Sequence, residues 1–204
     1  MIRLFHLVTL VLLAAHLPLR AKDKPAPTLP VHTRTEDVVY GRKFGVALTF
    51  DVIQPEKPNG FGIAYMVSGG WVSGYSPNTP LTYAPFLERG YTVFSVRHGC
   101  QPKFTIQEIT QDIHRAIRFI RHNAAKWQVN PDKLGISGGS AGGHLSLTMG
   151  VYGGPGDPKA ADPVDRESSA IQAIACFYPP TDFLNYGKPG ECAVGVGILE
   201  RFQP

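Results

Sequence analysis

Residues 134–147 read LGISGGSAGGHLSL, and this stretch decides the fold class. Residues 134–137 form a short apolar run typical of a buried strand, and a helix is predicted over 141–151. The turn between them, residues 138–142, matches the pattern Gly-x-Ser-x-Gly. Because a strand precedes the turn and a helix follows it, the sequence predicts a nucleophile elbow with Ser140 at its tip.

The spacing of this motif has a steric cause. A strand that turns sharply into a helix brings neighbouring backbones close together, and glycines at Gly138 and Gly142 leave no Cβ in the way. The turn lifts the Ser140 hydroxyl above the sheet edge, at a helix N-terminus whose N–H groups favour developing negative charge. The N–H of Ala141 is therefore predicted as one donor of an oxyanion hole. A glycine-rich turn that merely contains a serine is the alternative for the pentapeptide taken alone.

A second glycine pair lies upstream, at the end of another predicted strand (63–67). It stands in the sequence Ser68-Gly69-Gly70-Trp71. An oxyanion hole needs backbone N–H groups that side chains do not block, so Gly69 and Gly70 are predicted as its other donors. Gly-Gly is also common in ordinary turns. Its position between a strand and the downstream elbow favours the functional interpretation.

The rest of the chain alternates strands with helices after an initial hairpin. The longest helix is the clearest, because its apolar residues recur at helical spacing. This order predicts an α/β fold with a mainly parallel sheet and helices on both faces. Strands are predicted at 38–40, 46–52, 63–67, 91–96, 134–137 and 171–177, and helices at 81–89, 105–126 and 141–151.

Together these segments resemble the α/β-hydrolase fold, in its hormone-sensitive-lipase-like and bacterial carbohydrate-esterase-like branch. In that family the oxyanion motif usually reads His-Gly-Gly-Gly-Trp, and this chain has Val67 and Ser68 in place of the His and the first Gly. The resemblance covers about residues 38–186. It implies hydrolysis of carboxylic esters through a serine nucleophile, without a cofactor. The segments that carry it are 67–71, 112–121, 130–134, 138–144 and 178–182.

A serine hydrolase also needs a base that takes the serine proton and a carboxylate that orients the base. In this fold the chain order is serine, acid, histidine, yet no histidine follows His144. His144 lies one turn past Ser140 and is expected to point away from the hydroxyl. His98, which follows a strand, is the one candidate substitute, although a structural role is favoured for it. Asp182 is interpreted as structural or helix-capping, because the family's acid comes one strand later.

The sequence therefore lacks the last two strands of that fold and two members of the triad. We expect a C-terminally truncated chain with an unpaired sheet edge. Three functions stay open: an ester hydrolase, a serine peptidase of the prolyl-oligopeptidase kind, and a non-catalytic remnant or binding module. No propeller domain precedes the elbow, which weighs against the peptidase. The expected partner is a small-molecule or polymer-linked ester.

The N-terminus is typical of a secretory signal. Arg3 provides a short basic region, an apolar run follows it, and Ala21 offers a small residue for cleavage. The run is shorter than the roughly 18 residues that a spanning helix needs, and an uncleaved anchor is the alternative. The predicted organisation is a signal peptide (1–21), a linker (22–34) and a hydrolase domain (35–204). We expect a secreted or periplasmic protein with no stable membrane span after cleavage.

The charge balance does not suggest a nucleic-acid partner, because the formal charge is only +4 at pH 7. Basic residues do cluster on the polar side of the longest predicted helix. That cluster is interpreted as a solvated face. It consists of Arg115, Arg118, Arg121 and His122.

Neither a metal site nor a disulfide framework is predicted. Asp157, Asp162 and Asp165 lie in a polar loop without a recognised ligand spacing, and we expect them to be solvated. The three cysteines are irregularly spaced. Cys100 and Cys176 are therefore interpreted as small core residues.

Overall fold

The computed structural model describes residues 29–75, 80–185 and 189–190. The predicted signal peptide (1–21), most of the predicted linker and Cys192 lie outside the described residues. Within the described part, no helix is long and apolar enough to cross a membrane.

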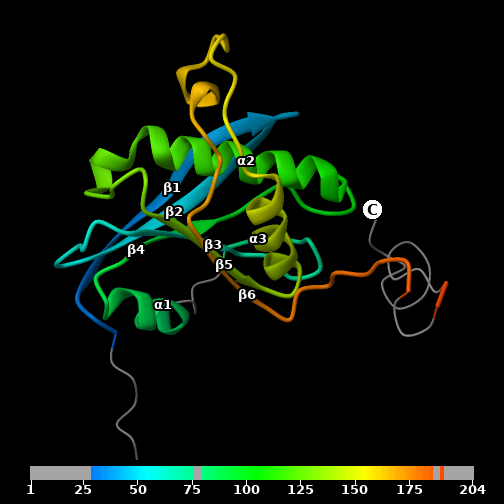
Figure 1. Cartoon of the computed structure of the whole chain (residues 1–204). Coiled ribbons are helices and arrows are strands. Elements are labelled where there is room, and N and C mark those ends of the chain that lie inside the picture. Colours follow the sequence, from blue (N-terminus) through cyan, green and yellow to red (C-terminus); the bar gives the residue numbers. More distant parts are fainter. Residues whose placement is uncertain (1–28, 76–79, 186–188, 191–204) are drawn as a thin grey trace, which may run out of the picture.

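A six-stranded, mainly parallel sheet forms the centre of the molecule (Figure 1). Its strands are β1 (His32–Lys43), β2 (Val46–Pro55), β3 (Gly62–Met66), β4 (Thr92–Val96), β5 (Leu134–Gly139) and β6 (Ala173–Phe177). Their order across the sheet is β1-β2-β4-β3-β5-β6. β1 pairs antiparallel with β2, and β2 pairs antiparallel with β4. The other four strands run parallel, which confirms the predicted hairpin and the mainly parallel sheet.

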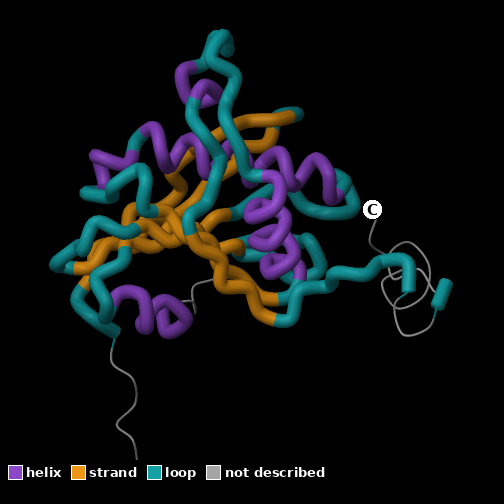
Figure 2. Tube along the Cα trace, in the orientation of Figure 1, coloured by secondary structure: helices purple, strands orange, loops and turns teal. Residues whose placement is uncertain are grey.

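Helices cover both faces of this sheet, as predicted. α1 (Pro80–Leu87) lies on one face, and α2 (Ile106–His122) and α3 (Ala141–Tyr152) lie on the other. Figure 2 shows the same three layers, with the strands between the helices. Two short 3₁₀ helices, η1 (Ala124–Trp127) and η2 (Pro163–Arg166), follow α2 and α3 along the chain.

The longest helix, α2, begins with a complete capping box. The Thr105 hydroxyl accepts from the N–H of Glu108, and the Glu108 carboxylate accepts from the N–H of Thr105. The helix ends at His122 rather than at the predicted residue 126, and η1 continues the chain. Its apolar stripe is fully buried and faces the sheet. The stripe consists of Ile109, Ile113, Ala116, Ile117 and Ile120.

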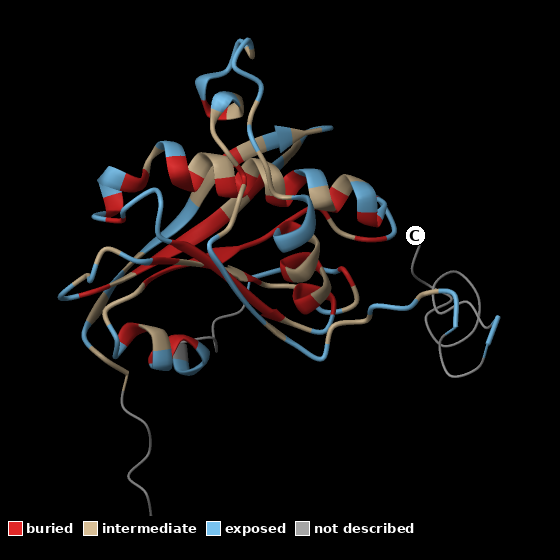
Figure 3. Cartoon of the chain, in the orientation of Figure 1, coloured by how far each residue is buried: buried red, intermediate tan, exposed pale blue. Residues whose placement is uncertain are grey.

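Strand β4 separates two hydrophobic cores and is buried along its whole length (Figure 3). Phe94 and Val96 belong to the larger core under α2 and α3. Val93 belongs to a smaller core under α1. Ser95 also faces α1, where its hydroxyl lies 2.8 Å from the Tyr83 hydroxyl. This alternation follows from the period of two along a strand.

The basic face of α2 is not solvated, contrary to the sequence-based interpretation. The Arg115 guanidinium pairs with Asp162 at 2.7 Å and Asp165 at 2.8 Å. Arg121 is 9% exposed and donates to the backbone carbonyls of the 168–170 segment. The loop between α3 and β6 therefore packs across α2, where it rises above the helix in Figure 1. Helical periodicity identifies a polar face, but it does not show that a later loop covers that face.

The two edges of the sheet differ in character. β1 begins at His32, ahead of the domain start expected at residue 35. Within the described residues β6 pairs with β5 alone. Ile174 is 41% exposed and Phe177 is 55% exposed. An edge of this kind offers unpaired backbone groups and apolar side chains to a further segment or to another molecule.

Candidate active site

Ser140 occupies a tight turn between β5 and α3. Its backbone has φ 51° and ψ −123°, a conformation that an L-residue adopts only when the surroundings impose it. Two hydrogen bonds impose it here. The Ser140 N–H donates to the Phe177 carbonyl at 3.0 Å, and the Ser140 carbonyl accepts from the His144 N–H at 2.9 Å. Ser140 itself is exposed, so its hydroxyl is open to a ligand.

The glycines on either side of Ser140 are required by close backbone contacts. A Cβ added to Gly138 would lie 2.6 Å from the carbonyl oxygen of Gly142. A Cβ added to Gly142 would lie 2.6 Å from the carbonyl oxygen of Met66, at the end of β3. Such distances are far inside van der Waals contact. The steric reason given for the Gly-x-Ser-x-Gly spacing is therefore present in the structure.

The segment after β3 forms a second tight turn, which we call the oxyanion turn (residues 67–73). Gly69 and Val72 exchange two backbone hydrogen bonds of 3.0 Å each. Gly70 and Trp71, between them, both have positive φ, at 56° and 57°. Within the described residues the N–H groups of Gly70 and Ala141 make no hydrogen bond. The Gly69 N–H is instead held by the Val72 carbonyl.

The sequence proposed three donors, and the structure therefore separates them into two groups. Among the described residues, the N–H groups of Gly70 and Ala141 are left without a hydrogen-bond partner. Gly69 closes the turn that presents Gly70. A residue pattern identifies which backbone groups are unobstructed, but only the folded turn shows which of them is already bonded.

An aromatic cluster joins the oxyanion turn to α3. The Trp71 indole N–H donates to His144 Nδ1 at 3.3 Å. The Phe183 ring lies 5.7 Å from the Trp71 ring and 5.2 Å from the His144 ring, measured between centroids. Burial lowers the pKa of His144, which keeps its imidazole neutral and able to accept from Trp71. One ring nitrogen of His144 is therefore occupied by Trp71, and this contact links α3 to the turn.

The other candidate base, His98, is buried directly after β4. Its Nδ1 lies 2.6 Å from the Gly99 carbonyl, and its Nε2 is buried without a hydrogen-bond partner among the described residues. Burial lowers the pKa of His98 to about 4. The remaining described histidines are also bonded elsewhere. His32 contacts Pro30, His114 contacts Ser169 and His122 contacts Glu167.

Asp182 closes a local turn, which fits a structural role. Its carboxylate accepts from the N–H groups of Leu184 and Asn185, at 3.0 Å each. The Asn185 amide also donates to it. Hydrogen bonds from Asn185 and Leu184 lower the pKa of Asp182. The carboxylate is thus fully engaged by its own turn.

The two described cysteines are half-buried, so their interpretation as small core residues is wrong. Cys176 lies on β6, opposite Gly138. The Cys100 thiol bonds to the backbone of Ser73 at the end of the oxyanion turn. Cys100 and Phe183 are the residues near the site that sequence reasoning missed, because nothing in a local pattern links them to the glycine pair.

Comparison with known proteins identifies the family. The family model described as BD-FAE matches residues 50–194, which is more than half of the chain and includes both glycine turns. The chain belongs to the BD-FAE family. It is an α/β-hydrolase-fold protein with esterases among its relatives.

Two curated relatives show how much of this BD-FAE chain is shared. It is 27% identical over 165 residues to the esterase LipQ of Mycobacterium tuberculosis (strain ATCC 25618 / H37Rv). That alignment covers 79% of this chain and 39% of LipQ. It is 30% identical over 157 residues to neutral cholesterol ester hydrolase 1 of Bos taurus, which covers 73% of this chain and 36% of that protein. The chain thus spans less than half the length of these relatives.

Solved structures of similar fold are esterases as well. The apo form of Thermogutta terrifontis esterase 2 aligns with a TM-score of 0.62 at 25% identity, covering 86% of this chain and 64% of that one. A truncated carbohydrate esterase from gut microbiota aligns with a TM-score of 0.66, covering 82% and 64%. At 24% identity, the second likeness shows the fold alone.

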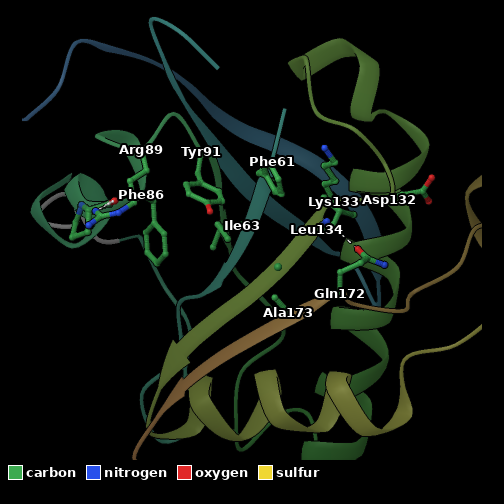
Figure 4. Close-up of a pocket in the computed structure, with 13 residues that line it drawn as sticks. Phe61, Ile63, Phe86, Arg89, Tyr91, Asp132, Lys133, Leu134, Gln172 and Ala173 are labelled. Carbon is green, nitrogen blue, oxygen red and sulfur yellow. Dashed lines mark hydrogen bonds between the residues drawn. The ribbon is translucent and has the colours of Figure 1, made fainter. Parts of the chain in front are cut away.

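One cavity of this BD-FAE domain lies well away from the elbow. It measures about 480 Å³ and is lined by residues at the beginning of β3 and β5, with Phe61, Tyr91 and Lys133 among them (Figure 4). Ser140 follows the other end of β5. The catalytic edge of a parallel sheet is the carboxyl edge of its strands, so this cavity is not the reaction site.

A second cavity, of about 270 Å³, lies beside the aromatic cluster. It is lined by residues of α2 and α3 together with Phe183 and His144. His144, which contributes to its lining, lies one helical turn from Ser140. It is the nearer of the two to the candidate nucleophile.

Proposed function

We propose that this chain carries the nucleophile and the oxyanion hole of a carboxylic ester hydrolase. The observation that carries the proposal is the geometry of Ser140. Its exposed hydroxyl sits in a strained turn at the beginning of α3, beside the N–H of Ala141, which has no partner in the described part of the chain. Esterase names among the relatives, including an acetylxylan esterase of Xylanibacter ruminicola, support the same reaction class.

In the proposed reaction the Ser140 Oγ attacks the acyl carbonyl carbon as a general base removes its proton. The carbonyl oxygen becomes an oxyanion, and the N–H groups of Gly70 and Ala141 donate hydrogen bonds to it. Collapse of the tetrahedral intermediate expels the alcohol and leaves the acyl group on Oγ. Water then attacks the acyl-enzyme and releases the acid. Both glycine turns thus act on charge that develops in the transition state.

The proposed base is not among the described histidines, since each of them is buried or bonded elsewhere. This observation favours a second candidate, a binding module that keeps the elbow and does not turn over esters. The two candidates differ in one property: a serine without a base is not an activated nucleophile. Structures of Thermogutta terrifontis esterase 2 phosphorylated by paraoxon and phosphonylated by sarin show that an esterase of this fold reacts with such probes.

We propose small or polymer-linked esters outside the cytoplasm as the substrates. Support comes from the signal-like N-terminus and from the acetylxylan esterase among the relatives. The 270 Å³ cavity beside Phe183 has room for a small acyl or alcohol group. Fractionation of the producing cells tests the location. Recovery of the protein in the cytoplasm alone contradicts export.

The test of the reaction compares wild type with Ser140→Ala on p-nitrophenyl acetate. Ser168→Ala, in the loop that packs on α2, is the matched control. The proposal predicts turnover by wild type and the control, and loss of at least 10³-fold in Ser140→Ala, as expected when a serine nucleophile is removed. Equal slow hydrolysis by all three proteins, with the fold intact, supports the binding module instead.

A further inference from the structure

We propose that Cys100 is a positioning residue for this reaction, because its thiol holds the oxyanion turn in the conformation that presents the Gly70 N–H. The inference rests on the proposed function for its chemical meaning. Its geometric part is independent of turnover and can be measured separately. Cys100 does not touch the reacting atoms, and it acts only through Ser73 and the turn.

The Cys100 thiol meets both backbone polar groups of one residue. Its Sγ accepts a hydrogen bond from the Ser73 N–H at 3.2 Å and donates one to the Ser73 carbonyl at 3.0 Å. The alternative acceptor, the His98 carbonyl, is farther away at 3.7 Å. A thiol has one donor and a weak acceptor, so Ser73 uses both capacities. The side chain therefore forms, with the Ser73 backbone, the two hydrogen bonds that a neighbouring strand would otherwise form.

The oxyanion turn needs such outside support. Trp71 has a left-handed conformation, which is unfavourable for a residue with a Cβ and persists only where the surroundings fix it. The Gly69–Val72 bridge closes the turn, but it does not fix how the turn sits on the sheet. That placement decides where the Gly70 N–H points.

Other contacts besides the thiol also hold the turn. The Val67 N–H donates to the Val96 carbonyl at 3.0 Å, and the Trp71 indole N–H donates to His144. The Gln101 N–H donates to the Trp71 carbonyl at 3.1 Å. The Ser73 hydroxyl donates to the Val67 carbonyl at 2.5 Å, which joins the two ends of the turn. Cys100 is thus the residue whose side chain anchors the outgoing end, next to a backbone contact from the following residue.

The segment that carries Cys100 is itself fixed by buried charges. The Gly99 N–H donates to the Asp112 carboxylate at 2.9 Å, and the Lys43 ammonium pairs with the same carboxylate at 2.7 Å. Asp112 is 4% exposed. A Cβ on Gly99 would lie 2.6 Å from the Phe104 ring, so the segment packs closely against that side chain. Cys100 therefore links the oxyanion turn to a segment that is itself bonded to α2.

Cys100→Ala removes the thiol contacts and leaves both backbones in place. We expect amide hydrogen exchange at Ser73 and Val72 to accelerate about tenfold, because a protecting contact is lost. Outright loss of one oxyanion donor costs about 10²–10³ in kcat, so a misplaced donor is expected to cost about tenfold, with KM within about twofold. Cys100→Ser keeps a donor and an acceptor, and is expected to restore exchange and kcat to within about threefold of wild type.

Cys176→Ala is the matched control, because it removes the thiol of the other described cysteine, which lies on β6 and not beside the oxyanion turn. It is expected to leave the exchange at Ser73 unchanged. Unchanged exchange and unchanged kcat in Cys100→Ala overturn the proposal. Faster exchange with unchanged kcat also overturns it, since the thiol then holds a turn that does not matter for the reaction.

A chemical variant keeps the proposal testable even if Cys100→Ala does not fold. In the protein with Cys176→Ser and Cys192→Ser, methyl methanethiosulfonate converts the folded Cys100 thiolate to a methyl disulfide and releases methanesulfinate. The product has no S–H, so the Ser73 carbonyl loses its donor. Slower turnover that dithiothreitol reverses supports the proposal, and unaltered turnover at full modification contradicts it.

The outcomes for the two proposals are distinguishable. If wild type shows no Ser140-dependent turnover, the proposed function fails, and with it the positioning role of Cys100 in the reaction. The exchange data then still report whether the thiol holds the turn. If wild type is active, Ser140→Ala is inactive and the Cys100 variants behave like wild type, the proposed function stands and the positioning role fails.

Discussion

Gly142→Ala tests the contact between α3, at the elbow, and the end of β3, from which the oxyanion turn continues. The added Cβ would lie 2.6 Å from the Met66 carbonyl oxygen and 3.3 Å from the Met66 Cβ. Relief to an ordinary contact of about 3.4 Å requires β3 and α3 to separate by about 0.8 Å, because both partners are parts of a close-packed interior. Overpacking of this kind costs about 1–3 kcal/mol. At about 2–4 °C per kcal/mol for a domain of this size, we expect Tm to fall by about 2–12 °C.

The same displacement moves the oxyanion turn relative to Ser140. A misplacement near 1 Å costs about 10²-fold in rate, so kcat/KM for p-nitrophenyl acetate is expected to fall about 30- to 100-fold. Gly154→Ala is the control, since a Cβ there meets nothing within 4 Å. Thermal unfolding and steady-state kinetics are measured on both variants. A Gly142→Ala protein with the Tm and kcat/KM of wild type refutes the argument that backbone contact fixes this turn.

Three further predictions concern stability. Burial raises the pKa of Asp51, but hydrogen bonds from two arginines and a backbone N–H outweigh it and hold the pKa at about 2. Asp51 therefore contributes about 2 kcal/mol to the free energy of unfolding above pH ~4, and this contribution is lost as the pH falls towards 2. Asp51→Asn should flatten the fall in urea stability between these pH values, and an unchanged fall contradicts the assignment. Ile113→Ala deletes a fully buried side chain and should lower the free energy of urea unfolding by about 3 kcal/mol, whereas Gln111→Ala, at an exposed position, should lower it by less than about 0.5 kcal/mol. Equal losses would mean that α2 is not packed as described. Arg115→Ala removes two partly exposed ion pairs, so it should lower the free energy of unfolding by about 1 kcal/mol and speed proteolysis of the loop after α3. An unchanged cleavage rate would mean that Arg115 does not hold this loop on α2.

The elbow could be predicted from the sequence because its cause is local. Tight approach of β5 and α3 requires glycine at 138 and 142, and that requirement is visible within five residues. The capped, amphipathic α2 could be predicted for the same reason, since its cap and stripe are contained in one segment. Only its last turn was placed wrongly, because a change from α to 3₁₀ geometry leaves the spacing of apolar residues almost unaltered.

Features that depend on distant segments could not be predicted. The polar face of α2 looks solvated until the loop after α3 brings Asp162 to Arg115. The thiol of Cys100 looks like a core atom until the fold places it against Ser73. The Gly69 N–H looks available until the turn closes it onto Val72. Each of these contacts joins residues through three-dimensional packing or turn geometry that periodicity does not encode.

The central claim is that Ser140 is the nucleophile of an ester hydrolase, and its most direct test is stoichiometric reaction with paraoxon. Attack by the Ser140 Oγ on phosphorus would form a diethylphosphoryl ester and release p-nitrophenolate, which is counted by absorbance. Peptide mass spectrometry then locates the adduct. The account predicts one equivalent released and a diethylphosphoryl group on Ser140, with no release from folded Ser140→Ala. Folded wild type that releases no p-nitrophenolate, or that carries the adduct on another residue, contradicts it.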